Sequence, residues 1–188
     1  MGSENILPGI SLKDENKQLE NIIDIAQENL DNARRSVEKL NEDLSDLREV
    51  YDAQDKEGLV LWNNAAAQLE ENKRNVLRCE KARKKPYFGR IDFKDPKQKD
   101  EEAYYIGRVG IAKNASEPVV IDWRAPIASV YYENSLGPCK YTVSSEGTFE
   151  IDLKRKRTYE IADDKLVDFF DSDVVANDEL LTKYLAKN

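Results

Sequence analysis

A heptad repeat of apolar residues runs through the first third of the chain and limits its fold more than any other feature. Between Leu19 and Tyr51 these residues recur at alternating spacings of four and three. This spacing gives a helix one apolar stripe that packs against a partner helix in a coiled coil. The repeat consists of Leu19, Ile23, Ala26, Leu30, Ala33, Val37, Leu40, Leu44, Leu47 and Tyr51. The sequence therefore predicts one long helix that needs a partner.

A second repeat after Gly58 supplies that partner. With Lys73 as a polar exception, its positions are Leu59, Trp62, Ala66, Leu69, Lys73 and Val76. The link at residues 52–58 is too short for a parallel return, so the two helices must be antiparallel. Counting outward from the bend pairs Leu47 with Trp62, Leu40 with Leu69, and Ala33 with Val76.

Both ends of this helical hairpin carry recognisable signals. Ser11 and Asp14 have the spacing of a capping box and predict the start of the first helix. Pro86 predicts the end of the second, because the residue before a proline disfavours helical angles. The first helix therefore extends beyond the second. This overhang carries a wide apolar stripe, which we expect to dock on the rest of the chain. Its members are Leu19, Ile22, Ile23 and Ile25.

The composition fits an arm with little interior, because charged residues make up 35% of the chain and apolar ones 40%. A net charge of −8 argues against general nucleic-acid binding, although a local basic patch stays open. The absence of histidine excludes Ser-His-Asp and Cys-His catalysis and imidazole metal ligation. Cys79 and Cys139 are the only cysteines, which excludes a disulfide framework and a Cys-rich zinc site.

From Tyr87 onward the apolar period becomes that of β-strands. The predicted strands span residues 87–93, 103–112, 119–122, 129–133, 140–144, 148–161 and 165–170. Residues 145–147 and 162–164 are typical of hairpin turns, so we expect an antiparallel meander in consecutive order. Asn177-Asp178-Glu179, followed by Leu180 and Leu181, predicts a last helix.

These patterns predict an α+β fold with a long antiparallel two-helix coiled-coil arm, a small antiparallel β-rich domain and a C-terminal helix. The expected boundaries are a leader at 1–13, the arm at 14–85, the β-rich domain at 86–174 and the start of the helix at 175–188. Because the chain ends within a helix pattern without a capping glycine, we interpret it as a piece of a longer protein. Without a membrane-spanning run or a signal peptide, we expect a soluble, cytoplasmic protein.

Four carboxylates at the bend are the first candidate site: Glu49, Asp52, Asp55 and Glu57. One interpretation is a solvated hairpin bend. The other is a surface that meets a cation or a basic channel of a partner, since Mg²⁺ is commonly held by one or two carboxylates plus waters. Their position at the extremity of an arm strengthens the second interpretation.

Other charged and glycine-containing segments have simpler explanations. Gly107 and Gly110 lie in a strand pattern, where glycine marks a bulge or close packing. The cluster Lys154–Arg157 is either an exposed strand or a phosphate or partner contact. The basic residues at 78–85 suit a helix C-terminus. Asp171 and Asp173 lack the glycine of a calcium loop, so we expect no intrinsic metal site.

Four segments resemble the N-terminal region of HelD, the UvrD/Rep-like family of RNA-polymerase-associated DNA helicases of Gram-positive bacteria. They are Tyr105–Ile111 (YIGRVGI), Val120–Pro126 (VIDWRAP), Arg157–Ile161 (RTYEI) and Asp178–Leu181 (DELL), and they follow the coiled coil in the family's order. The signature positions are Gly107, Arg108, Gly110, Asp122, Trp123, Arg124 and Pro126. We expect structural roles for them: an internal Asp122–Arg124 pair, a packed Trp123 beside it, and Pro126 closing the strand.

The resemblance implies that the arm enters the secondary channel of bacterial RNA polymerase, where Asp52, Asp55 and Glu57 approach the active-site Mg²⁺. It also implies helicase domains further along the parent chain, which bind ATP, Mg and DNA and help to release and recycle stalled polymerase. The present chain has no G-x-x-x-x-G-K-[ST] or G-x-G-x-x-G loop, so we expect no catalytic site and no cofactor in it. Its expected partners are polymerase and the helicase domains in cis.

Two other functions stay open. The Gre transcript-cleavage proteins also combine an acidic-tipped coiled coil with a β-rich domain, so a stand-alone channel factor of that kind is one alternative. The Gre tip motif, however, is not visible here. The other alternative is a coiled-coil adaptor or homodimeric scaffold, which the heptads alone do not exclude.

Overall fold

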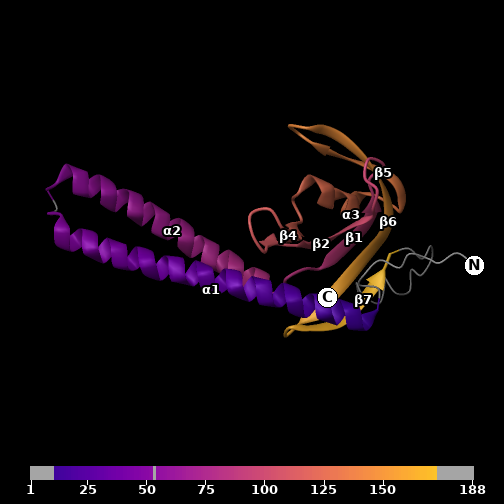
Figure 1. The fold of residues 1–188 in the computed structure, drawn as a ribbon, viewed down its shortest axis with the longest axis horizontal. Helices are drawn as coiled ribbons and strands as arrows, with labels where there is room; N and C mark the ends of the chain where they lie inside the picture. Colours follow the sequence, from indigo (N-terminus) through magenta and orange to yellow (C-terminus); the bar gives the residue numbers. More distant parts are fainter. Residues whose placement is uncertain (1–10, 53, 173–188) are drawn as a thin grey trace, which may run out of the picture.

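The computed structural model describes residues 11–52 and 54–172. Two long helices, α1 (Leu12–Val50) and α2 (Lys56–Lys84), form an arm that projects from a β-sheet body (Figure 1). This architecture confirms the predicted α+β class. The predicted C-terminal helix at 175–188 and residues 1–10 of the predicted leader lie outside the described residues.

Side-chain caps fix where both arm helices begin. Ser11 accepts a hydrogen bond from the backbone N–H of Asp14 at 3.1 Å and donates one to its carboxylate at 2.7 Å, which confirms the predicted cap. At the bend, the Asp55 carboxylate accepts from the backbone N–H groups of Glu57 and Gly58 at 3.0 and 3.4 Å. Asp55 is thus the N-cap of α2. The helix begins at Lys56, so the expectation that the link extends to Gly58 was wrong.

The two arm helices pair in the predicted antiparallel register. The Arg48 guanidinium lies over the Trp62 ring, 5.0 Å from its centroid, and Leu47 lines the same cavity as Trp62. Nearer the body, Arg34 forms an ion pair with Glu80 at 3.2 Å. The heptad pattern therefore predicted the pairing along the arm correctly.

The body is a mixed sheet in which the strands are not in consecutive order. Its strands are β1 (Gly89–Lys94), β2 (Glu102–Gly107), β3 (Ile111–Ala112), β4 (Pro118–Asp122), β5 (Gly137–Val143), β6 (Gly147–Ala162) and β7 (Lys165–Asp171). The spatial order is β3-β4-β2-β1-β6-β5, and β7 also pairs with β6. Since β2 and β4 are parallel and β1 pairs with β6, the predicted antiparallel meander was wrong. The long β6 pairs with β5 and β7 and also with β1, which is far from it in the sequence.

The predicted strand at 129–133 is a helix. The short 3₁₀ turn η1 (Pro126–Ala128) leads into α3 (Ser129–Glu133), because Pro126 suits the first position of a helical turn. The β-branched and aromatic residues of this segment favour strands in isolation, and tertiary packing overrides that preference. The predicted strand at 103–112 is likewise divided into β2 and β3.

Both predicted hairpins are present, between β5 and β6 and between β6 and β7. In the second, Asp163 and Asp164 have φ angles of 51° and 61°. Two successive positive φ values are those of a type I′ turn, whose twist matches that of the flanking strands.

The overhang of α1 docks on the sheet, as predicted. α2 ends at Lys84, ahead of Pro86, and the earlier turns of α1 cover one face of the sheet. They bury Leu19, Ile22, Ile23 and Ala26 against Tyr87, Ile111, Val120, Tyr159 and Ile161. Each buried Leu or Ile side chain contributes about 1.5–3 kcal/mol. The arm and the body therefore share one continuous helix and one core.

A second core lies on the other face of the sheet. Ile91 and Ile106 are fully buried there with Val130 of α3. Neighbouring residues along a strand point to opposite faces. As a result, Arg90 of β1 points toward α1 while Ile91 points toward α3.

Candidate functional site

The carboxylates predicted at the bend lie at the end of the arm farthest from the sheet (Figure 1). Glu49 is in the last turn of α1, Asp52 in the link and Glu57 in the first turn of α2, and all three are exposed. Asp55 is exposed too, but its carboxylate caps α2. The structure thus places all four at or next to the bend and gives Asp55 a structural role that sequence reasoning missed.

Tyr51 closes the bend over Gly58. A Cβ atom added to Gly58 would lie 2.5 Å from the Cβ atom of Tyr51, so any side chain at this position would require Tyr51 to shift. Beside this contact is a cavity of about 290 Å³ whose lining includes Leu47, Asp52 and Trp62. The tip is therefore a defined turn with aromatic packing as well as acidic side chains.

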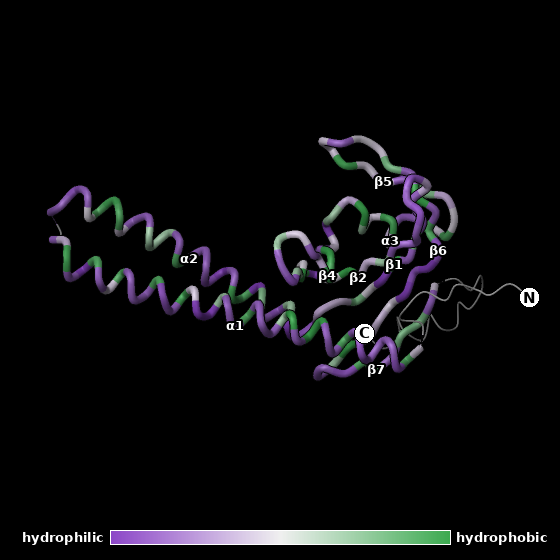
Figure 2. The backbone as a smooth tube through the Cα atoms, viewed as in Figure 1, coloured by the Kyte–Doolittle hydropathy of each residue, from purple (hydrophilic) through white to green (hydrophobic). Residues whose placement is uncertain are grey.

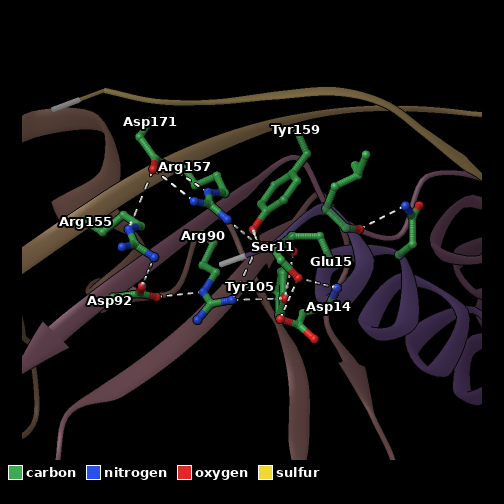
Figure 3. Close-up of polar contacts among 12 residues, drawn as sticks. Ser11, Asp14, Glu15, Arg90, Asp92, Tyr105, Arg155, Arg157, Tyr159 and Asp171 are labelled. Atoms are coloured by element: carbon green, nitrogen blue, oxygen red, sulfur yellow. Dashed lines mark hydrogen bonds and ion pairs between the residues drawn. The ribbon is translucent and has the colours of Figure 1, made fainter. Parts of the chain in front are cut away.

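A buried carboxylate attaches the start of α1 to the sheet (Figure 3). Glu15 is fully buried. Its Oε1 accepts hydrogen bonds from Tyr159 at 2.8 Å and from Arg157 at 2.7 Å. Its Oε2 accepts one from Tyr105 at 3.1 Å, and Arg90 Nη1 lies 3.6 Å from Oε1. These four partners come from three strands, β1, β2 and β6.

The network continues across the sheet and balances its charges. Arg90 donates to Asp92 at 2.6 Å, and Arg155 Nη1 lies 3.4 Å from the second oxygen of Asp92. Arg157 holds Asp171 through two hydrogen bonds of 2.6 and 2.9 Å. With the α1 carboxylate included, three acids face three guanidinium groups. We call these residues and the two tyrosines the anchor network.

Burial raises the pKa of Tyr105 to about 12 and raises that of Tyr159 well above its ordinary value. Both hydroxyls therefore stay protonated at neutral pH and remain donors to Glu15. Charges buried in this way are held firmly, because removing one partner would leave another charge unpaired in the interior. The arrangement is suited to fixing the direction of the arm.

Sequence reasoning missed the anchor network and misinterpreted its basic members. The cluster Lys154–Arg157 was expected to be an exposed strand or an outside contact. Instead, its two arginines face carboxylates of the same chain. Lys154 pairs with Asp152 at 2.5 Å, and Lys156 donates to the carbonyl oxygen of Asn134 at 2.7 Å. The alternation of charged and apolar residues in β1 is typical of a half-exposed strand, and only the structure shows that β1 is buried on both faces.

The signature glycines differ in their roles. A Cβ atom on Gly107 would lie 2.5 Å from the carbonyl oxygen of Pro86 and 2.9 Å from Val120, so the predicted close packing is confirmed. Gly110 and the exposed Arg108 lie in the bend between β2 and β3. At Gly110 an added Cβ atom would make only ordinary contacts.

The predicted Asp122–Arg124 pair is present. Arg124 donates to the two oxygens of Asp122 at 2.9 and 2.6 Å, and this guanidinium lowers the pKa of Asp122. Trp123 was expected to be packed, but it is 47% exposed and only edges against Tyr132, with ring centroids 6.3 Å apart. Pro126 begins η1, beyond the end of β4. β4 ends at Asp122, so Trp123 lies just beyond the strand.

The base of the arm meets the body at two further places. A cavity of about 190 Å³ there is lined by Asn29, Asn75, Arg78, Cys79, Asp122 and Arg124, among others. On the other side, Arg83 binds Asp164 at 2.5 and 2.8 Å and Gln27 at 2.9 Å. The basic segment was expected only to stabilise the end of its helix. Arg83 also contacts the turn between β6 and β7.

Within residues 11–52 and 54–172, no group of three or more Asp, Glu or Cys side chains is placed to hold a metal ion. Cys79 and Cys139 are not disulfide-bonded. None of the described helices carries an apolar stretch that would cross a lipid bilayer.

The arm and the sheet together match one known protein family. The model of the family described as "DNA helicase IV HelD, N-terminal domain" matches residues 12–183. This range includes both arm helices and all seven strands. A search of curated proteins finds no match to the chain.

Proposed function

The chain belongs to the family of HelD N-terminal domains, and on that premise we propose that it is the polymerase-binding module of a HelD-like, UvrD/Rep-family, ATP-dependent DNA helicase. The arm inserts into the secondary channel of bacterial RNA polymerase and helps to release and recycle stalled polymerase. ATP, Mg and DNA are bound by helicase domains of the parent protein, which work in the cytoplasm with polymerase.

The observation that carries this proposal is the shape of the arm. α1 has 39 residues and is therefore roughly 58 Å long at about 1.5 Å per residue. Its first turns are buried in the body, and the rest pairs with α2 to form a narrow two-helix rod. A rod of this kind, with an acidic bend at its end, is suited to entering a channel in a larger partner.

The anchor network supports the same proposal. The arm and its base are one continuous helix, and Glu15 ties that helix to three strands. A probe that must reach a defined depth needs a fixed direction, which a charge-balanced buried joint supplies. Movement of the body would therefore be transmitted to the tip.

The tip carboxylates are the groups that would interact with the active site of polymerase. Glu49, Asp52 and Glu57 have exposed side chains at the far end of the rod, and Mg²⁺ is commonly held by one or two carboxylates together with waters. We assign to them the approach to the Mg²⁺ of the polymerase active site. Asp55 contributes charge but is engaged in capping α2.

The experiment that tests this function is a pull-down with bacterial core RNA polymerase. The comparison variant replaces residues 37–72 by a short Gly-Ser loop, which joins the helices at facing positions and keeps the buried overhang. Circular dichroism checks that the sheet and the remaining helix are intact. We expect the full chain to bind polymerase and the shortened arm to lose binding. Equal binding by both proteins would show that the arm is not the contact.

A further inference from the structure

We propose that the tip of the arm carries an apolar groove that docks a partner segment in which apolar side chains are flanked by Lys or Arg. This inference rests on the proposed function, since it names the chemistry that the arm meets in polymerase. It assigns the hold on the partner to this groove rather than to the carboxylates at the bend.

The first turns of α2 carry more apolar surface than α1 can cover. Leu59, Val60, Leu61 and Trp62 are consecutive, and at 3.6 residues per turn they point to nearly all sides of the helix. Only one side faces α1. As a result, Val60 is 58% exposed and Leu61 is 40% exposed, while Val50 at the end of α1 is 73% exposed. Figure 2 shows hydrophobic stretches continuing to the far ends of both helices.

Part of this surface forms a groove between the two helices. A cavity of about 440 Å³ lies beside the bend, on the seam between α1 and α2. Its apolar lining consists of Leu40, Leu47, Val50, Tyr51, Leu61 and Ala65. Ligand pockets in proteins measure about 300–1,000 Å³, so the groove has room for apolar side chains of a partner. We call it the tip groove.

The rim of the tip groove is acidic. Asp43 and Asp46 line its α1 side, and both are exposed. Neither belongs to the ion pairs seen among the described residues, where the α1 ion pair nearest to them joins Arg34 to Glu80. Carboxylates without a cation beside an apolar groove favour a partner whose apolar side chains are flanked by positive charge.

The same charges disfavour other occupants. A second copy of the chain would bring an identical acidic rim to the contact, and like charges facing each other across an interface cost free energy. Nucleic acids and anionic lipid surfaces are disfavoured for the same reason. A basic and apolar protein segment is the occupant that satisfies both the lining and the rim.

Binding to core RNA polymerase, measured by biolayer interferometry, tests the tip groove. The test variant is Val50→Ser with Leu61→Ser, which removes apolar lining at two exposed positions. The matched control is Val60→Ser with Leu77→Ser, because it removes the same residue types at two sites that are 58% exposed and lie outside the groove. We expect the test variant to raise the Kd at least about tenfold, as truncation of buried interface anchors does. The control should stay within about twofold of the unchanged chain.

A second variant tests the charge of the rim independently of the apolar lining. Asp43→Asn with Asp46→Asn should slow association and flatten its dependence on salt. Its matched control is Glu38→Gln with Glu42→Gln, which removes two exposed α1 carboxylates outside the groove. If the rim variant and its control showed the same salt dependence, the proposal that Lys or Arg residues flank the docked segment would be overturned. Thermal unfolding of each variant confirms that the arm remains folded.

The outcomes separate this inference from the proposed function. If the shortened arm loses polymerase but the Val50→Ser, Leu61→Ser variant binds like its control, the tip groove is overturned while the arm contact stands. If the shortened arm binds normally, the proposed function itself fails. Light scattering supplies the remaining outcome: a dimer that the groove variant converts to a monomer would assign the groove to a second copy and overturn the inference.

Discussion

The hydroxyl of Tyr159 donates a hydrogen bond of 2.8 Å to the carboxylate of Glu15, which lies 144 residues earlier in the chain. This contact joins the first turn of the arm helix to the longest strand of the sheet. Because Glu15 is fully buried, losing any one of its partners would leave a charge unpaired in the interior and lower the stability of the folded chain. The direction of the arm is therefore decided in the interior of the body.

Replacing Glu15 tests this dependence. Glu15→Gln keeps the shape of the side chain but removes the charge that Arg157 and Arg90 face. Breaking one side of a buried ion network costs about 3–5 kcal/mol, so we expect the free energy of unfolding in urea to fall by about that amount. Glu20→Gln is the control, since Glu20 is exposed on the same helix and should change stability by less than about 0.5 kcal/mol. Equal effects would contradict the anchor network.

The pH dependence of stability should reflect the buried tyrosines. Burial raises the pKa of Tyr105 to about 12 in the folded chain, while the pKa of an exposed tyrosine is about 10. Between these values the unfolded chain loses the proton and the folded chain keeps it, so stability falls as the pH rises from about 10 toward 12. Urea unfolding should show a shallower fall for Tyr105→Phe. An unchanged slope in this variant would contradict the assignment.

Gly58→Ala tests how the bend is closed. In an ordinary helix, alanine is favoured over glycine by roughly 0.5–1 kcal/mol. Here the new Cβ atom meets Tyr51, so we expect destabilisation of about 1–3 kcal/mol, as in other overpacked sites. In a Tyr51→Ala background the same substitution should be neutral or stabilising. A double-mutant cycle of chemical unfolding measures the coupling, and the absence of coupling would contradict the close contact.

Substitutions at Asp55 and Asp52 should change the stability of the chain by different amounts, although both residues are exposed carboxylates at the tip. Asp55→Ala removes the N-cap of α2 and should cost about 0.5–2 kcal/mol, whereas Asp55→Ser keeps the cap. Asp52→Ala should change stability by less than about 0.5 kcal/mol. Thermal unfolding distinguishes these results. If Asp55→Ser were as destabilising as Asp55→Ala, capping would not be the role of Asp55.

The pair Asp52→Asn and Asp55→Ser therefore tests tip charge without removing the cap. We expect this double variant to bind polymerase with little loss but to release stalled complexes more slowly with the parent helicase. A Gre-like factor would instead stimulate Mg²⁺-dependent transcript cleavage and lose that activity in the double variant. A transcript-cleavage assay with the unchanged chain separates the two, and stimulated cleavage would favour the Gre-like alternative.

The parts of the fold that sequence reasoning predicted correctly are those with local signals. The heptads from Leu19 to Tyr51, the cap at Ser11 and the turn at Asp163 each depend on residues a few positions apart. The pairing of β1 with β6 depends on residues distant in the sequence, and no periodicity encodes it. The segment 129–133 was misassigned because its residue types favour strands while its packing requires a helix.

The candidate site follows the same division. The acidic bend could be located from the hairpin alone, whereas the anchor network could not. Glu15 resembles an ordinary acid in a first helical turn, and Arg157 resembles an exposed strand residue. Their burial arises only when α1 docks on the sheet. Trp123 is the opposite case, because a large aromatic residue predicted to be packed is exposed where its strand ends.

Site-specific photocrosslinking tests the central claim, that the arm tip enters the secondary channel of polymerase, most directly. A crosslinking residue at Gln54 occupies the bend without replacing a carboxylate, and one at Asp163 marks the exposed turn of the body as the control. We expect crosslinks from position 54 to map to residues that line the secondary channel, and those from position 163 to map outside it. Crosslinks from position 54 only to the outer surface of polymerase, or none while position 163 reacts, would contradict the claim.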